Sequence, residues 1–102
     1  MTNRYGAKLD RNGYAPSIVH DGPCYFCGAH ETTRHEIFYG SGRREKCKAL
    51  GLWASVCPIC HRLVHDELLD DEKLRQKAQE AAMERYGWDE SDFITEFGRN
   101  YL

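Results

Sequence analysis

The sequence predicts a small α+β domain, and three observations lead to that prediction. Two cysteine pairs, each with two residues between the cysteines, stand 29 residues apart. Residues 32–39 (TTRHEIFY) and 52–56 (LWASV) have the β-branched and aromatic content of short strands. Beyond the second pair, apolar residues at helical spacing and glycine stops predict helices up to the end of the chain.

Length and composition restrict the class of protein. A chain of 102 residues, with 41% hydrophobic and 29% charged residues, has the size and composition of one globular domain. It contains no apolar run long enough to span a membrane, and residues 1–10 lack the apolar centre of a signal peptide. The net charge of −2 argues against a protein that coats nucleic acid by bulk charge. We therefore expect a cytoplasmic protein without a membrane partner.

The chain divides into three consecutive parts of one domain. Residues 1–23 are weakly patterned, with a turn signal at Asn12-Gly13, and predict an irregular arm with at most one short hairpin. Residues 24–69 hold both cysteine pairs and form the expected core, and residues 70–102 form the C-terminal helices. Four helices are expected, over residues 43–50, from Pro58 to about Leu69, from Asp70 or Asp71 to Gly87, and from Asp89 or Ser91 to Gly98.

The cysteine pairs are Cys24 with Cys27 and Cys57 with Cys60. Two such tight turns can supply four thiolates to one tetrahedral ion, which suits zinc. In an intracellular chain, paired cysteines hold metal more often than they form disulfides. The sequence therefore predicts a structural zinc site, whereas Cys47 is expected to be a partly buried small apolar residue.

Three histidines stand near the cysteine pairs. His61 directly follows Cys60, and His65 lies four residues further on, so both share one face of the expected helix. If the strand that carries His35 packs against this helix, three imidazoles converge beside the zinc site. Glu36 adds a carboxylate next to His35, although strand alternation turns it to the other face unless the strand end redirects it. We expect a second divalent cation here.

These residues resemble the HNH endonucleases, also called ββα-metal nucleases. The resemblance rests on CYFC before a strand, on RHEIFYG, and on GLWASVCPICHRLVH with CPICH at the helix start. The head YGAKLDRNGYAPS and the tail ERYGWDESDFITEFGRNYL are similar to a small phage and prophage subgroup with paired zinc knuckles. The resemblance implies a zinc-stapled ββα-metal core, DNA as partner, and the cytoplasm of a bacterial host as location, with any phage or host protein partner left open.

The resemblance also implies an activity, namely metal-dependent hydrolysis of phosphodiester bonds by a DNA endonuclease or nickase. A histidine base activates water, and a divalent cation such as Mg, Mn, Ni or Zn stabilises the leaving oxygen. His61 and His65 match the ligands of this cation. The alternative is a non-catalytic zinc-knuckle module that binds DNA or protein through a degenerate HNH site.

Two departures from the family pattern leave residue roles open. The family's first motif is usually Asp-His or His-His, ligand then base, whereas this chain has Arg34-His35-Glu36. In one alignment His35 is a ligand and Glu36 takes the base position; in the other His35 is the base. A slight preference goes to His35 as base, because imidazole titrates near neutral pH. The family's middle asparagine falls near Leu52, which is apolar.

Basic residues concentrate between the cysteine pairs. Arg34, Arg43 and Arg44 are the candidates for contacts with backbone phosphates beside the cation. The alternative interpretation of the run at 43–48 is a solvated helix face.

Overall fold

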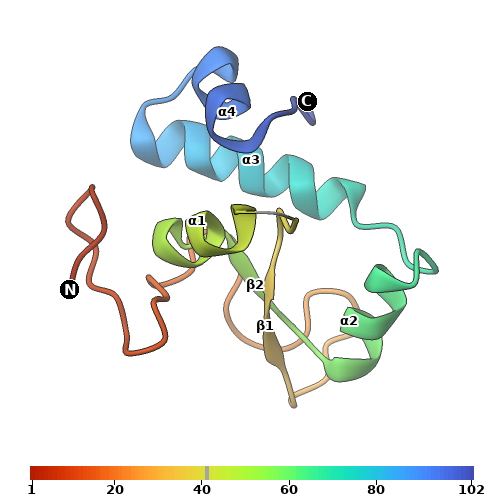
Figure 1. Cartoon of the computed structure of the whole chain (residues 1–102). Helices are drawn as coiled ribbons and strands as arrows, with labels where there is room; N and C mark the ends of the chain where they lie inside the picture. The colour runs from red at the N-terminus through yellow and green to blue at the C-terminus, as the bar shows by residue number, and fades with distance from the viewer. Residues whose placement is uncertain (41) are drawn as a thin grey trace.

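The computed structural model describes residues 1–40 and 42–102 and has an α+β fold. Its elements are, in chain order, β1 (Thr33–Glu36), α1 (Arg43–Leu50), β2 (Trp53–Val56), α2 (Pro58–His65), α3 (Glu72–Tyr86) and α4 (Glu90–Phe97) (Figure 1). β1 and β2 form a two-stranded antiparallel sheet. No helix in the described part of the chain is both long and apolar enough to cross a membrane.

The sheet is shorter than the sequence predicts. β1 pairs with β2 in a register that sets Thr33 opposite Val56 and His35 opposite Ala54. β2 has only four residues, so the ladder closes at Glu36, although the Ile37 amide still donates to the Leu52 carbonyl at 3.1 Å. The apolar residues after the strand pack into the core instead. Burying such a side chain stabilises the fold more than one further residue in an edge strand would.

The first helix follows the expected bounds, and a glycine ends it. Gly51 has a φ of 73°, in the left-handed region, and its amide donates to the carbonyls of Cys47 and Lys48. A side chain at this position would run into the Pro16 carbonyl, so the close approach of the N-terminal arm also requires glycine. The chain can therefore turn from α1 directly into β2.

The second helix starts as predicted but ends four residues early. Cys57 is the N-cap and Pro58 occupies the first turn, as its fixed φ allows. The helix ends at His65 rather than near Leu69, because Glu67 adopts a left-handed conformation with φ of 60°. The Glu67 amide donates to the Val64 carbonyl and closes the turn. A glutamate gives no sequence signal for such a stop.

The C-terminal helices belong to the same core as the sheet. α3 lies across α1, and α4 packs on the far side of α3 (Figure 1). Phe38, which follows β1, packs against Phe93, Phe97 and Tyr101 with ring centroids 5.0–5.2 Å apart. The aromatic contacts join the end of the chain to the strand that carries His35.

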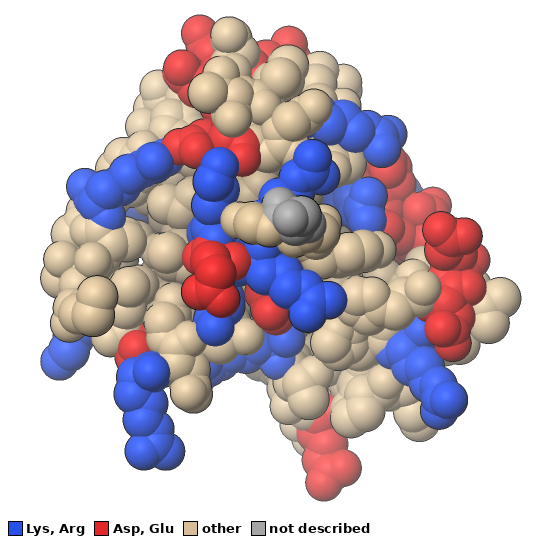
Figure 2. Space-filling view, in the orientation of Figure 1, with Lys and Arg blue, Asp and Glu red and all other residues tan. Residues whose placement is uncertain are grey.

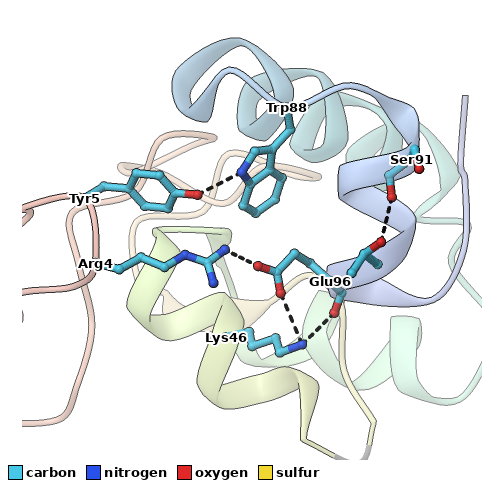
Figure 3. A network of polar contacts seen from close by, with 7 residues as sticks. Arg4, Tyr5, Lys46, Trp88, Ser91 and Glu96 are labelled. Atoms are coloured by element: carbon cyan, nitrogen blue, oxygen red, sulfur yellow. Dashed lines mark hydrogen bonds and ion pairs between the residues drawn. The ribbon is translucent and has the colours of Figure 1, made fainter.

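The N-terminal arm is irregular, as expected, and two groups of contacts are among those that fix it. Figure 3 shows one of them, where Arg4 and Lys46 pair with Glu96 of α4 while the Trp88 indole donates to Tyr5 at 2.8 Å. At the other, the arm runs beside β2 and accepts hydrogen bonds from the Trp53 indole and the Ser55 amide at 2.8 and 3.0 Å. The arm therefore joins the sheet to α1 and α4.

Candidate metal centres

The four paired cysteines come together at the start of α2. Their sulfur atoms lie within 4.8 Å of one another, and the sulfurs of Cys27 and Cys57 are 3.6 Å apart. A zinc tetrahedron with Zn–S bonds of about 2.3 Å has S–S edges of about 3.8 Å. The spacing of Cys24, Cys27, Cys57 and Cys60 therefore fits one ion. The cluster can hold a structural metal such as zinc with four protein ligands.

Backbone amides favour the thiolate form of Cys24, one of the four cysteines. Burial opposes the charged form of Cys24, but N–H groups of Cys57, Cys27 and Phe26 outweigh it and lower the pKa of the thiol to about 6. The Cys57 sulfur in turn accepts the Cys60 amide at 3.4 Å as the cap of α2. Such amides stabilise thiolate, which is the form that binds metal.

Cys47 is separate from this cluster. Its side chain is fully buried on α1, and its thiol bonds to the Phe38 carbonyl at 3.2 Å. Burial raises the pKa of Cys47 to about 12, so it stays a neutral thiol. Cys47 lies outside the metal cluster, as expected, but it is fully buried rather than partly buried.

Three histidines form a second cluster beside the cysteines. His35 comes from β1, and His61 and His65 come from successive turns of α2. The ring centroids are 4.9 Å apart for His35 and His61, 5.7 Å for His35 and His65, and 4.7 Å for His61 and His65. One nitrogen from each ring lies within 4.8 Å of the others. The three rings therefore converge on one small space.

His35 is the most unusual member of the cluster. It is 0% exposed, and within the described residues neither of its ring nitrogens has a hydrogen-bond partner. Buried polar atoms are nearly always paired, because leaving one unpaired costs on the order of 1–3 kcal/mol. Burial, with the neighbouring charges of His61 and His65, lowers the pKa of His35 to about 3. The ring is thus neutral near pH 7, with a lone pair free for a cation.

The histidines open onto a cavity of about 120 Å³. Its other walls are Glu36, Tyr39 and Arg44. Glu36 reaches the cavity although it alternates with His35, because it is the last residue of an edge strand. Burial and the nearby Glu36 carboxylate raise the pKa of Tyr14, which keeps this phenol protonated beside Glu36. A carboxylate and a guanidinium therefore border the same space as three imidazoles.

Sequence reasoning missed one wall of this cavity. The Tyr39 ring lies 4.8 Å from His65 and 6.0 Å from His35 between ring centroids. Arg75 of α3 donates to the Tyr39 hydroxyl at 3.0 Å and is itself held by Asp71 at 3.1 Å. The only available signal was the even spacing of Tyr39 from His35 along the expected strand. Nothing in the sequence pointed to Arg75.

The three candidate arginines lie in different places. Arg44 borders the histidine cavity and has no carboxylate partner among the residues that the structure describes. Arg34 lies in a separate groove, where it pairs with Asp10 at 2.7 Å and stacks on Tyr14. Arg43 lies against Gly98, beyond α4. Of the three, Arg44 is the one placed beside the histidines.

The surface charge around α1 is mixed. Figure 2 shows Lys and Arg side chains gathered over α1 near the centre of this face, with acidic side chains among them. Glu45, for example, pairs with Lys48 on this helix at 3.6 Å. This face therefore does not present the large uniform positive field that would attract a polyanion.

Comparisons with models of protein families, with curated proteins and with solved structures find no match to this chain. The resemblance to HNH endonucleases therefore stays an expectation from the quoted motifs. Function is inferred from the residues of the two clusters and their surroundings.

Proposed function

We propose that this protein is a metal-dependent DNA endonuclease or nickase of the HNH type, with the histidine cluster as its reaction centre. The observation that carries the proposal is His35, a fully buried imidazole that faces His61 and His65 and whose two ring nitrogens have no partner among the described residues. Burying an imidazole in this state is costly unless a ligand satisfies it. A divalent cation bound by all three rings supplies that partner.

Three donors suit a reactive site better than a structural one. A site with three protein ligands keeps coordination positions for water or substrate, whereas four ligands close it. A bound divalent cation polarises a phosphate oxygen and stabilises the charge that develops on the leaving oxygen. His35, His61 and His65 would hold the cation, and the cavity of about 120 Å³ beside them would receive the phosphate.

The geometry favours the alignment in which His35 is a ligand. Its ring faces the two α2 histidines and is itself shielded from bulk solvent, an arrangement that suits a ligand more than a proton acceptor. Glu36, which is half-buried at the cavity edge, then holds the base position. As a carboxylate it would accept the proton of the attacking water.

Arg44 binds the phosphate in this proposal. It borders the same cavity as the histidines, and its guanidinium pairs with no carboxylate among the described residues. Guanidinium groups match two phosphate oxygens at once. The charge of Arg44 also disfavours protonation of His35 and His61, whose pKa values are lowered mainly by burial.

A plasmid-nicking assay tests the proposal. Supercoiled plasmid is incubated with the protein and magnesium, manganese, nickel or zinc, and relaxed and linear products are quantified. His65→Ala removes an exposed ligand, so the variant should fold and yet lose at least about a hundredfold in rate. His30→Ala, also at an exposed histidine but outside the cluster, is the matched control and should cleave normally. Equal cleavage by the two variants would contradict the proposal.

The binding-only alternative rests on Leu52. This residue stands where the family has an asparagine that orients the base, and its side chain is fully buried. If wild-type protein retains DNA without cleaving it under any of the four metals, the alternative replaces the nuclease. If cleavage depends on His65, the missing asparagine is not required for activity in this chain.

A further inference from the structure

Thr33 stands at a junction between the two clusters. It opens β1, and its cross-strand partner is Val56, the residue directly before Cys57. Because Thr33 and His35 alternate with Arg34, their side chains share the face of the strand that meets α2. The Thr33 hydroxyl lies 3.3 Å from the Val56 carbonyl oxygen and 3.4 Å from Nδ1 of His61.

The single hydrogen of this hydroxyl determines which ring nitrogen of His61 is protonated. A threonine hydroxyl has one hydrogen to donate and lone pairs that accept. The Val56 carbonyl can only accept, so the hydroxyl hydrogen must point to it if that contact is a hydrogen bond. The Thr33 oxygen is then an acceptor toward His61, and Nδ1 of His61 must carry a hydrogen.

The opposite arrangement satisfies fewer groups. If the hydroxyl donates to Nδ1 of His61 instead, the contact with the Val56 carbonyl is no longer a hydrogen bond. A neutral His61 then carries its hydrogen on Nε2, and neither ring nitrogen has a lone pair left for a cation. Only the first arrangement makes both contacts hydrogen bonds and leaves Nε2 of His61 unprotonated.

We propose that Thr33 is a positioning residue that fixes His61 in the Nδ1–H tautomer, so that Nε2 is the cation-binding atom. This rests on the proposed function, in which His61 is a ligand. Metal-bound histidines commonly donate their second nitrogen to a neighbouring group, which fixes both tautomer and ring orientation. Here the Thr33 hydroxyl also contacts the carbonyl of the residue before Cys57, at the strand end that leads into the cysteine cluster. The same hydroxyl therefore helps to fix the backbone next to Cys57 and to orient His61.

Nuclear magnetic resonance of the imidazole nitrogens tests the assignment directly. The full chain, loaded with one zinc per molecule and no other cation, is measured at a pH where His61 is neutral. Nitrogen shifts and couplings distinguish the Nδ1–H form from the Nε2–H form, and the Nε2–H form is the more populated one for free histidine in water. We expect His61 in the Nδ1–H form. Finding it in the Nε2–H form would overturn the proposal without any variant.

Two substitutions at Thr33 separate the hydroxyl from the shape of the side chain. Thr33→Val keeps the β-branched form that suits a strand but removes the hydroxyl, and Thr33→Ser keeps the hydroxyl. The valine variant should shift His61 toward Nε2–H, and the serine variant should restore Nδ1–H. An unchanged tautomer in the valine variant would contradict the role of Thr33.

The affinity of the histidine cluster for nickel gives a second readout, by calorimetric titration. Loss of a partner of this kind typically weakens metal binding by about 10- to 100-fold, and the lower end is expected for a contact of 3.4 Å. Equal nickel affinity in wild type and Thr33→Val would count against positioning. Absence of nickel binding in the wild type would instead contradict the proposed metal site, while the tautomer result still decides the arrangement at Thr33.

Discussion

The cysteine cluster and the histidine cluster share α2 but differ in donors and in access. Four sulfurs can complete the shell of one ion, whereas three imidazoles leave positions open. The histidine cluster faces a cavity of about 120 Å³ bordered by a carboxylate and an arginine. One helix therefore carries a closed site at its first turn and an open one on the turns that follow.

The two clusters separate the groups that can stabilise the fold from the proposed reaction centre. Cys60 and His61 are consecutive residues, so an ion at the cysteines fixes the position from which His61 projects. The histidines need not contribute to folding and can remain poorly satisfied. His35, buried without partners in the described chain, is a local cost of this kind that a rigid surrounding structure can sustain.

The largest expected effect comes from opening the cysteine cluster. Cys57→Ser removes one of four zinc ligands, and structural zinc contributes on the order of 10 kcal/mol to the folding of small domains. We expect loss of bound zinc by elemental analysis and loss of cooperative unfolding by circular dichroism. Cys47→Ala is the control at a buried cysteine outside the cluster and should keep one zinc. Full zinc occupancy with Cys57→Ser would show that the sulfurs do not act as one site.

A change at the histidine cavity should affect rate and leave folding intact. Glu36→Gln preserves shape but removes the proton acceptor, so cleavage should fall by about 10²- to 10⁴-fold. Zinc content and the thermal midpoint should match wild type, because Glu36 is not part of the cysteine cluster. Glu45→Gln, on the exposed side of α1, serves as control. Unchanged cleavage by Glu36→Gln would return the base role to another group.

Acid should lower the free energy of unfolding because His35 is buried in its neutral form. Its pKa in the fold is about 3, against an ordinary value near 6.5, so the unfolded chain binds the proton first as pH falls. The free energy of unfolding should therefore decrease from about pH 6.5 toward pH 3, by at most about 1.4 kcal/mol per pH unit for this one group. The contribution is complete above about pH 6.5.

Urea unfolding at pH 7 and pH 5.5 measures this effect, without added divalent cation. His35→Asn is the comparison, because zinc release from the cysteines affects both proteins alike. The free energy of unfolding of wild type should fall relative to that of His35→Asn as pH decreases. If the free energies of unfolding of wild type and His35→Asn depend on pH in the same way, His35 is protonated in the folded protein.

The smallest effect is expected at the N-terminal arm. Arg4→Met removes the ion pair with Glu96 seen in Figure 3, but Arg4 is largely exposed. Exposed pairs contribute about 0–1 kcal/mol, and Lys46 still contacts Glu96. Thermal unfolding should show a shift of a few degrees or less, about 5 °C at most. A larger loss, or lost cleavage, would mean that the arm supports the histidine cluster.

Much of the helical framework could be predicted because glycines and caps mark it. Gly51, Gly87 and Gly98 end helices where the sequence indicates, each in the left-handed region. The end of α2 could not be predicted, since Glu67 adopts that conformation without a glycine signal. The strand bounds also differed, because the short β2 limits what β1 can pair with.

The candidate site was partly predictable for a similar reason. Spacing alone groups His61 with His65 and the cysteines in pairs, because these residues lie on one turn or one helix face. The contributions of Thr33, Tyr39 and Arg75 depend on packing between distant elements, which local spacing does not encode. Strand alternation does predict that Arg34 faces away from His35, and Arg34 indeed lies in a groove away from the histidines.

Cobalt titration tests the two-site division most directly. Cobalt bound by four thiolates gives intense charge-transfer absorption, and cobalt bound by imidazoles gives weak visible bands. We expect two ions per chain with these two signatures, and His61→Ala should lose only the weak one. A single cobalt per chain, or loss of both signals together in His61→Ala, would contradict it.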